Sequence, residues 1–366
     1  MRLILGGIFL FATAACSSSS DGGSPAGSTG GSNGGSNGDS TLICGTARPT
    51  LIYSTGISLS PPVADEQFLY FIDRIASVSK IPKAGGVAEQ VASLARGFGD
   101  QLYIDGNDLY GSNVFELYSI DKTDGTVTTL ATASSTSRID GIGMSVAFDD
   151  QYLYFADQAS SAQGDPLGTV KKMSKASREV TVLAQNQAGP DSFALDGQDL
   201  YWVNGGTADS NLDYLENESI VSMAKGGGPP RVLYDNKPSA SKIDLGWGEL
   251  IVTSSDLYFT SINLDDYSAS GLYRLPKGGG SPVKGSDCAA LSMFVENGAL
   301  YADCGDRISK FALPSLTETE LVCFPQSSKG STWMGHDADN IYYVKVDRLS
   351  SEDGGFLLGM YSIPYN

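Results

Sequence analysis

The chain alternates apolar and polar positions in short runs, and one such run recurs along its length. The run is a polar turn followed by a Leu-Tyr step, as in Asp196–Trp202 (DGQDLYW). Seven copies place their first apolar residue at Leu69, Leu109, Leu153, Leu200, Leu257, Leu300 and Ile341, which are 40, 44, 47, 57, 43 and 41 residues apart. A repeat of about 40–50 residues made of strands is typical of the blades of a β-propeller.

Each repeat contains further strand-like segments. An alternating segment follows the Leu-Tyr strand, as in Gly271–Pro276, and a turn such as Lys225–Gly228 leads to another short strand, as in Val127–Leu130. Successive side chains of a strand point to opposite faces, so the Leu and Tyr of one copy can each anchor one neighbouring blade. We therefore predict an all-β fold, a seven-bladed β-propeller of four-stranded antiparallel blades, with strands a, b, c and d in each. An unclosed β-solenoid and a β-sandwich are the alternatives, and the even spacing favours the propeller.

The two ends of the repeat region complement each other. The last copy stops at Asn366, just after its third strand, whereas an extra strand, Thr50–Tyr53, precedes the first copy. If this N-terminal strand completes the last blade, the ring closes and leaves no unpaired sheet edge there. We therefore predict that Leu51 and Tyr53 lie beside the Met360–Ile363 strand.

The N-terminal segment has the features of an export signal. Arg2 provides a positive charge, Leu3–Phe11 is an apolar run too short to span a membrane as a mature helix, and Ala14 and Ala15 precede Cys16. The segment resembles a bacterial lipoprotein signal, which implies that residues 1–16 are processed and that Cys16 is lipidated. In that resemblance, Ser17 implies the outer membrane. An ordinary secretory signal is the alternative.

Residues 17–40 are mainly Ser, Gly and Asn, which cannot bury enough apolar surface to fold. We expect a flexible tether there, followed by a single propeller domain over residues 41–366. The formal net charge of −18 argues against binding to nucleic acid or to anionic lipid headgroups. We expect a monomer that contacts the membrane only through its N-terminal lipid, and solubility at a crowded surface explains the charge.

Four cysteines remain after the lipidation site, and an even number in an exported chain favours disulfides. Three pairings are possible. Cys288 precedes strand a of the sixth blade and Cys304 follows its strand b, which places both at the same end of that sheet. We therefore favour Cys288–Cys304, and with it Cys44–Cys323. A zinc site is disfavoured because there is no Cys-x-x-Cys spacing and only one histidine.

Candidate ligand-binding residues lie mainly in the long loops that join strands b and c, because long loops on a rigid scaffold often carry function. These b–c loops are Asp157–Gly168, Asn204–Glu218, Ser261–Ser270 and Asp347–Phe356. The candidates are the acidic and aromatic residues Asp209, Asp213, Tyr214, Glu216, Asp265, Asp266 and Tyr267, together with Trp247 and Trp333 from predicted innermost strands. The alternatives are solvated loop charges and ordinary packing of the tryptophans.

Several ligand chemistries fit these residue types. Carboxylates and carbonyls can hold Ca²⁺, although no loop has the spacing of a known calcium site. Aromatic rings beside carboxylates suit sugars, which combine stacking faces with hydroxyl groups. The Asp residues that precede each Leu-Tyr step are interpreted as turn residues rather than metal ligands, since every blade needs the same hairpin turn. We predict no obligatory cofactor.

Motifs for catalysis are absent from the sequence. His336 is the only histidine, and outside the Ser/Gly-rich residues 17–40 there is neither a Gly-x-Ser-x-Gly motif nor a phosphate-binding glycine-rich loop. We therefore predict a binding or scaffold module for a protein or glycan, which uses the b–c loop face, rather than an enzyme. The alternative is a carbohydrate lyase or hydrolase that uses carboxylates at the central channel.

Two recurring motifs resemble those of uncharacterised propeller lipoproteins of myxobacteria. They are Asp-x-x-x-Leu-Tyr-Trp/Phe and Lys-x-Pro-Lys-Gly-Gly-Gly. They are also similar to the TolB propellers and to the YWTD propellers of low-density-lipoprotein receptors. The resemblance covers residues 50–366 and implies the fold. The YWTD family normally has six blades, and seven copies are present here, so its ligand face is not transferred to this chain.

Overall fold

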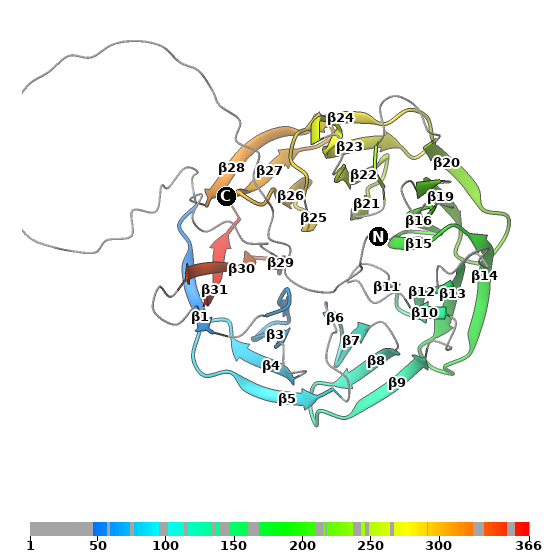
Figure 1. The fold of residues 1–366 in the computed structure, drawn as a ribbon. Helices are drawn as coiled ribbons and strands as arrows, with labels where there is room; N and C mark the ends of the chain where they lie inside the picture. Colours follow the sequence, from blue (N-terminus) through cyan, green and yellow to red (C-terminus); the bar gives the residue numbers. More distant parts are fainter. Residues whose placement is uncertain are drawn as a thin grey trace, which may run out of the picture. The chain divides into compact units, whose positions relative to one another are not determined.

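A computed structural model gives the structure of the protein. It describes residues 47–365 except 57–58, 74–76, 95–101, 113–115, 133–136, 140–145, 160–167, 209–214, 217, 237–242, 246–248, 264–266, 291, 325–332 and 350–355. The chain divides into two units, Met1–Thr41 and Leu42–Asn366. The second unit is a ring of seven antiparallel sheets around a central axis (Figure 1). The predicted seven-bladed propeller is therefore confirmed.

The strands follow one another from the centre of the ring outward in each blade. Blade 1 contains β2 (Val63–Ala64), β3 (Phe68–Ile72), β4 (Ser77–Pro82) and β5 (Glu89–Ser93), and blade 2 contains β6 (Leu102–Asp105), β7 (Asp108–Ser112), β8 (Glu116–Asp121) and β9 (Val127–Thr132). Blade 3 contains β11 (Val146–Phe148), β12 (Tyr152–Ala159), β13 (Gly168–Ser174) and β14 (Val180–Gln187), with β10 (Ser137–Ile139) added beside β12.

The remaining blades keep the same order. Blade 4 contains β15 (Pro190–Asp196), β16 (Asp199–Asn204), β19 (Glu218–Ala224) and β20 (Arg231–Asn236), and blade 5 contains β21 (Leu250–Val252), β22 (Asp256–Ser261), β23 (Gly271–Pro276) and β24 (Val283–Ser286). Blade 6 contains β25 (Ser292–Glu296), β26 (Ala299–Asp303), β27 (Arg307–Ala312) and β28 (Thr317–Cys323), and blade 7 contains β29 (Trp333–His336), β30 (Asn340–Leu349), β31 (Phe356–Pro364) and β1 (Thr50–Thr55).

Both faces of a blade are covered by its neighbours, which explains the Leu-Tyr step. Leu69 is fully buried in a cluster with Tyr342 and Val344 of blade 7. The next side chain, Tyr70, points the other way and packs in a cluster with Leu109 of blade 2. Burying each such side chain stabilises the fold by roughly 1.5–3 kcal/mol. The seven recurring pairs therefore form the seams between the blades.

The ring closes as the sequence predicts. β1 pairs with β31 in antiparallel register, with Leu51 opposite Tyr361 and Tyr53 opposite Met360. Ile52 is buried in the cluster that joins blade 7 to blade 1, whereas Leu51 is 53% exposed. The N-terminal strand thus supplies the outer strand of the last blade.

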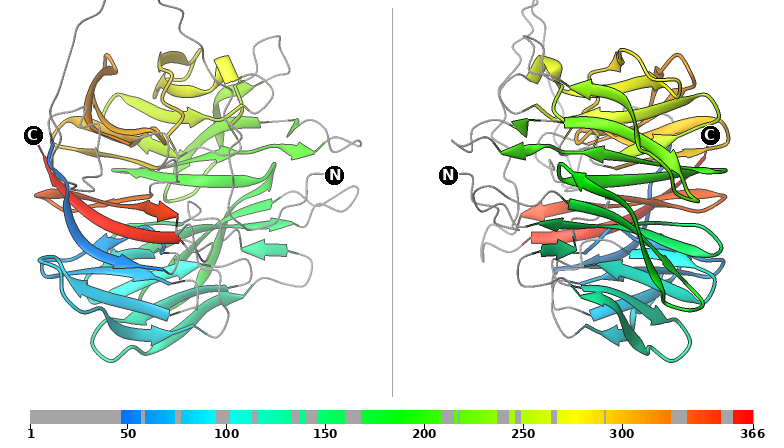
Figure 2. Two further views of the ribbon diagram at one scale, coloured as in Figure 1. Left: turned by 60° about the vertical axis from the view of Figure 1, so that its left-hand side comes forward. Right: turned by 90° about the vertical axis from the view of Figure 1, so that its right-hand side faces the viewer.

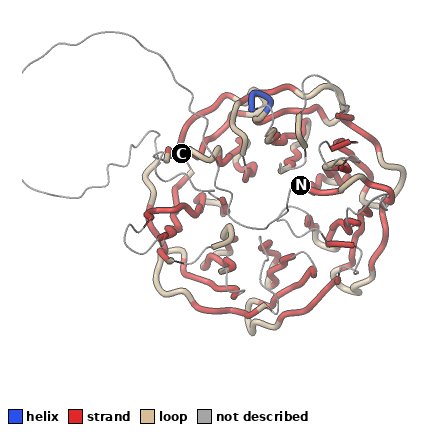
Figure 3. The backbone as a smooth tube through the Cα atoms, in the orientation of Figure 1, coloured by secondary structure: helices blue, strands red, loops and turns tan. Residues whose placement is uncertain are grey.

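The two faces of the ring carry different connections. In side view the strands run from one face to the other (Figure 2). Short a–b and c–d turns lie on one face, which we call the turn face, and the b–c loops lie on the opposite face. The longest of these loops contains a small hairpin of β17 (Thr207–Ala208) and β18 (Leu215–Glu216). Among the described residues the single helical turn is η1 (Tyr267–Ala269), drawn in blue in Figure 3.

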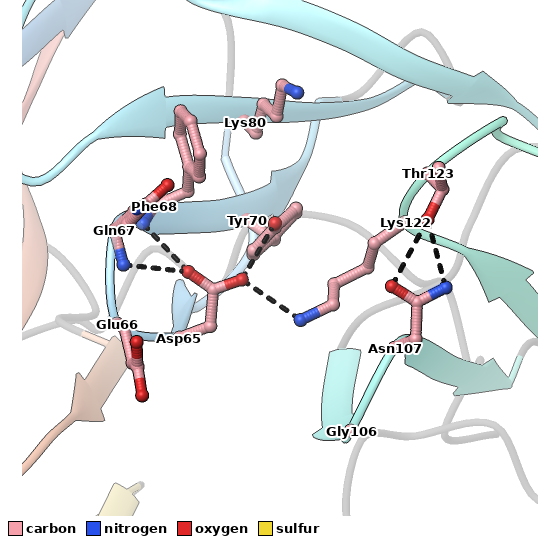
Figure 4. A pocket seen from close by; sticks show the side chains of 10 residues that line it. All are labelled: Asp65, Glu66, Gln67, Phe68, Tyr70, Lys80, Gly106, Asn107, Lys122 and Thr123. Carbon is pink, nitrogen blue, oxygen red and sulfur yellow. Dashed lines mark hydrogen bonds and ion pairs between the residues drawn. The ribbon is translucent and has the colours of Figure 1, made fainter.

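On the turn face, one Asp of each participating blade joins that blade to the next. Asp65 accepts hydrogen bonds from the amides of Gln67 and Phe68 at 3.0 and 2.9 Å and from the Tyr70 hydroxyl at 2.9 Å. Its Oδ2 also lies 2.9 Å from Nζ of Lys122, which belongs to the c–d turn of blade 2 (Figure 4). We call this Asp–Lys pair between adjacent blades a turn clasp. The Asp residues are thus turn residues, as the sequence indicates, and they also bind a lysine.

Turn clasps recur around most of the ring. The five in the described part of the chain are Asp337–Lys83, Asp65–Lys122, Asp105–Lys175, Asp149–Lys225 and Asp196–Lys277. At the two junctions that flank blade 6, the equivalent pairs of positions are Thr253 with Leu313 and Glu296 with Tyr365. Between blades 5 and 6, therefore, neither the acidic residue nor the lysine of a turn clasp is present. Between blades 6 and 7 the acidic residue is kept as Glu296, and Tyr365 stands in place of the lysine.

One predicted disulfide is present at blade 6. Cys288 and Cys304 are bonded, with a Cα–Cα distance of 4.9 Å and 16 residues between them in sequence. Cys323 is also disulfide-bonded. Cys44 lies outside the described residues, so its pairing with Cys323 stays a prediction.

Candidate functional site

Most of the loop residues predicted to bind a ligand fall outside the described part of the chain. These are Asp209, Asp213, Tyr214, Asp265, Asp266 and Trp247, and the lipidation site Cys16 is outside it as well. The backbone of Glu216 lies in β18, that of Tyr267 in η1 and that of Trp333 in β29, but their side chains are not described. Trp333 is thus in an innermost strand, as predicted.

The described residues instead bring a cavity together at the centre of the ring. This central cavity of about 250 Å³ is lined by residues from six of the seven blades. They are Pro61, Pro62, Val63, Ala64, Leu102, Tyr103, Ile104, Phe148, Glu249, Ser292, Met293, Phe294, Met334, Gly335 and His336. A concave, largely apolar cavity with a few convergent polar groups is the usual form of a small-molecule site.

Glu249 is the acidic group of this cavity. It directly precedes β21, and its carboxylate accepts a hydrogen bond from the Met293 amide on the innermost strand of blade 6. Glu249 is partly buried beside the cavity, and this burial raises its pKa to about 8 against the smaller opposing effect of the Met293 amide. The group can therefore change its protonation state near neutral pH.

Tyr103 reaches the same region from blade 2. Its ring meets the edge of Phe148, with centroids 6.2 Å apart and planes at 87°. Burial and the negative charges of Glu249 and Asp191 raise the pKa of the Tyr103 hydroxyl, and a hydrogen bond from the Val146 amide opposes them. The phenol consequently stays protonated at neutral pH, and it lies within electrostatic reach of carboxylates from blades 4 and 5.

A backbone irregularity accompanies the second of these carboxylates. Asp191 is in β15, the innermost strand of blade 4, where the register shifts between Asp191 and Ala194. Ser192, inside the shift, has φ of 50°, which a non-glycine residue adopts only when its surroundings hold it there.

His336 lies in β29 and packs against an aromatic ring. It stacks on Phe294 with centroids 3.9 Å apart and planes at 7°. Burial lowers the pKa of His336 against the opposing effects of Glu296, whose Oε2 is 3.9 Å from Nδ1, and Asp337. The imidazole is therefore neutral at pH 7. Asp337, not His336, caps the adjoining turn, because its Oδ1 accepts from the Asp339 and Asn340 amides.

These groups define what the cavity can do chemically. A carboxyl, a phenol, a hydroxyl from Ser292 and a neutral imidazole offer hydrogen bonds, and two phenylalanines and two methionines offer apolar contact. Lysine and arginine are missing from the described residues that line it. The described lining residues therefore offer no cation to pair with an anionic ligand. A neutral or cationic ligand needs no such partner.

A second and larger depression lies on the turn face. This turn-face pocket of about 470 Å³ is formed between blades 1 and 2 by Asp65, Glu66, Gln67, Phe68, Tyr70, Lys80, Gly106, Asn107, Lys122 and Thr123 (Figure 4). Its polar groups already bind one another: Asp65 and Lys122 form a turn clasp, and Asn107 contacts Thr123. Nζ of Lys80 lies 4.9 Å above the Phe68 ring. We therefore assign this pocket to the junction between blades rather than to a ligand.

Among the described side chains, no three or more His, Cys, Asp or Glu residues are grouped so as to hold a metal ion. Within the same part of the chain, no helix combines the length and apolar character needed to cross a membrane.

The fold places the protein in the class of β-propellers, and solved structures confirm the class. No protein-family model and no curated protein matches the sequence. Oligogalacturonate lyase from Vibrio parahaemolyticus is similar in structure, with a TM-score of 0.61 and 10% identity over 89% of this chain and 98% of that chain. An oligogalacturonate lyase in complex with manganese gives a TM-score of 0.59 and 11% identity over 88% and 99% of the two chains.

The likeness extends to a protein described without an enzymatic activity. The N-terminal domain of Nup159 gives a TM-score of 0.52 and 12% identity over 89% of this chain and 98% of that chain. At such identities the similarity shows the fold alone. The site must therefore be argued from the residues of this chain.

Sequence reasoning missed the residues that meet at the centre. Tyr103 lies in the innermost strand of blade 2 and Glu249 directly precedes that of blade 5, and these innermost strands have no repeated motif, unlike the Leu-Tyr strands. Only Trp247, two residues before Glu249, drew attention to this segment. The sequence could have pointed to Glu249 by its position, because it is an acidic residue directly before the buried Leu250, which begins an innermost strand.

Proposed function

We propose that the protein is a lipid-anchored, extracytoplasmic binding module that holds a protein or glycan ligand at its b–c loop face and in the central cavity. The central cavity carries the proposal, because six blades converge there on a buried carboxyl, a phenol and an apolar wall. A closed ring holds these groups rigidly, so binding needs little reorganisation.

The anchor is the first part of the proposal to test. The small residues before Cys16 and the Ser/Gly-rich segment after it support a lipid at Cys16 with a tether of roughly 25–30 Å root-mean-square reach. Bacteria that express the full chain and grow on radiolabelled palmitate should label the protein, and Cys16→Ala should abolish the label. Labelling that persists in Cys16→Ala would contradict the anchor.

The ligand is the second part. The full-length chain, solubilised in detergent, would be screened against a glycan array and used to capture proteins from an envelope extract. Binding that is lost in Tyr103→Phe and Glu249→Gln but kept in Glu66→Gln supports the central cavity, since Glu66 is exposed on the turn face. Binding that none of these variants alters would place the ligand elsewhere on the ring.

A second candidate function is that of a carbohydrate lyase or hydrolase. The structural similarity to oligogalacturonate lyases favours it, as does the pKa of Glu249 near 8, which suits proton transfer at neutral pH. The absence of lysine and arginine from the described lining residues favours binding instead, since no cation there would pair with a polyuronate. Release of unsaturated or reducing ends from pectic and neutral oligosaccharides, abolished by Glu249→Gln, would establish the enzyme and overturn the first proposal.

A further inference from the structure

Glu249 has an incomplete set of partners for a buried carboxyl. Within the described residues its one hydrogen bond comes from the Met293 amide. A carboxylate has two oxygens that can accept about four hydrogen bonds, and a buried one is normally paired with a cation or fully hydrogen-bonded. The lysines of the turn clasps do not pair with Glu249, because they form ion pairs with Asp residues.

The surroundings of Glu249 suit a cation better than an anion or a water cluster. The wall of the central cavity includes the rings of Phe148 and Phe294 and the thioethers of Met293 and Met334. One face of Phe294 is stacked on His336, and Nζ of Lys175 lies 5.1 Å from the centroid of the Phe148 ring, so these rings supply apolar contact for the carbon skeleton of a ligand and leave its charge to Glu249. The Tyr103 oxygen and Ser292 Oγ supply further acceptors on other blades.

We propose that the central cavity binds a protonated primary amine, with Glu249 as its counter-ion and the aromatic wall against its carbon skeleton. This inference rests on the proposed function, namely that the cavity is a ligand site, and it specifies the chemical class of the ligand. The ammonium donates hydrogen bonds to the free carboxylate oxygen and to the Tyr103 oxygen. A cavity of about 250 Å³ accommodates a ligand group of roughly monosaccharide size.

Binding of this kind moves a proton. Empty, Glu249 is largely protonated at pH 7 because burial raises its pKa to about 8, and an ammonium beside it favours the carboxylate. The other titratable groups that line the cavity do not change state, because Tyr103 and His336 stay neutral. Each amine bound at pH 7 therefore releases nearly one proton, whereas an uncharged analogue releases none.

Isothermal titration calorimetry of the full-length chain tests the inference, with glucosamine and methylamine as amine probes and glucose as the uncharged match for glucosamine. The expected result is affinity for glucosamine at least about tenfold above that for glucose. The apparent enthalpy for glucosamine should differ between phosphate and HEPES at pH 7, two buffers that contain no primary amine, as proton release requires. Glu249→Gln should remove both effects, and Glu66→Gln should preserve them.

Other outcomes separate this inference from the proposed function. Equal affinity for glucosamine and glucose, unchanged by Glu249→Gln, overturns the amine assignment and leaves the sugar site standing. Failure of both amines to bind at about 50 mM also overturns the amine assignment. The proposed function is then tested separately, by whether the b–c loop face captures a ligand. Thermal unfolding of Glu249→Gln at pH 6 shows that the variant is folded, so that lost binding reflects the lost charge.

Discussion

Asp337 and Lys83 lie more than 250 residues apart in sequence and form an ion pair, with Nζ 2.5 Å from Oδ2. Asp337 caps the a–b turn of blade 7, and Lys83 follows strand c of blade 1, so this turn clasp joins the last blade to the first. The Tyr342 hydroxyl donates to the same oxygen at 2.7 Å. The ring is therefore closed on the turn face by a side-chain pair as well as at its edge by β1.

Removing the lysine of that closing clasp should destabilise the domain. Both side chains are largely buried, so Lys83→Ala leaves the Asp337 carboxylate with less compensation and should lower the free energy of unfolding by about 1–2 kcal/mol. Urea unfolding monitored by fluorescence measures this. Lys80→Ala is the control, because its 3.8 Å pair with the exposed Glu89 should contribute at most about 0.5 kcal/mol. Equal effects would contradict a closing role.

The clasps predict loss of stability in acid. Burial alone would raise the pKa of Asp65, but hydrogen bonds from the Phe68 and Gln67 amides, Lys122 and Tyr70 outweigh it and lower the pKa to about 2. The pKa values of Asp149 and Asp337 are lowered in the same way. Since the folded state holds these groups as carboxylates, their contribution is present above the unfolded pKa near 3.8 and is lost as the pH falls toward 2.

Urea unfolding between pH 6 and pH 2.5 would show this loss. Asp65→Asn should be less stable than the parent by about 1–2 kcal/mol at pH 6 and by less than half of that at pH 2.5, where the carboxylate begins to be protonated in the folded state. A difference that does not shrink with falling pH would mean that the carboxylate charge contributes nothing.

Glu249 should affect stability in the opposite sense. Its raised pKa means that the folded state favours the protonated acid, so its ionisation destabilises the protein as the pH rises from about 4.5 through about 8. Glu249→Gln should therefore stabilise the domain at pH 9 by roughly 2–4 kcal/mol relative to its effect at pH 5. Thermal unfolding across this range measures the difference. A pH-independent effect would show that the carboxyl is freely hydrated.

The closing strand offers a matched pair of variants. Ile52→Ala removes a buried side chain from the cluster shared with Phe71 and Tyr342 and should cost about 2–4 kcal/mol. Leu51→Ala, one residue away and 53% exposed, should change stability by less than about 0.5 kcal/mol. Chemical unfolding of both variants compares them directly. Similar losses would be inconsistent with β1 packing Ile52 inward.

Much of the fold could be predicted because each seam repeats. Leu69 and Tyr70 predicted one anchor toward each neighbour, and the unmatched strand at Thr50 predicted closure. The Cys288–Cys304 disulfide followed from the direction of antiparallel strands. These features depend on local alternation, which a sequence displays directly.

The central cavity could not be predicted in the same way. Glu249, Asp191 and Tyr103 come from three blades, and only the closed ring brings them together. Their burial is a property of the channel, not of the strands that carry them. The turn clasps were likewise visible only as repeated Asp and Lys residues, because their pairing joins consecutive blades rather than residues of one repeat.

Closure by β1 also constrains the order of events during biosynthesis. β1, the first described strand along the chain, is the partner of β31, the last described one, so β1 has no partner until β31 has been synthesised. Seams formed earlier hold an open arc, which exposes an apolar blade face at each end and leaves β1 unpaired. A nascent or truncated chain that ends before Phe356 therefore offers β1 nothing to dock on, and quality-control proteases should distinguish it from the finished ring.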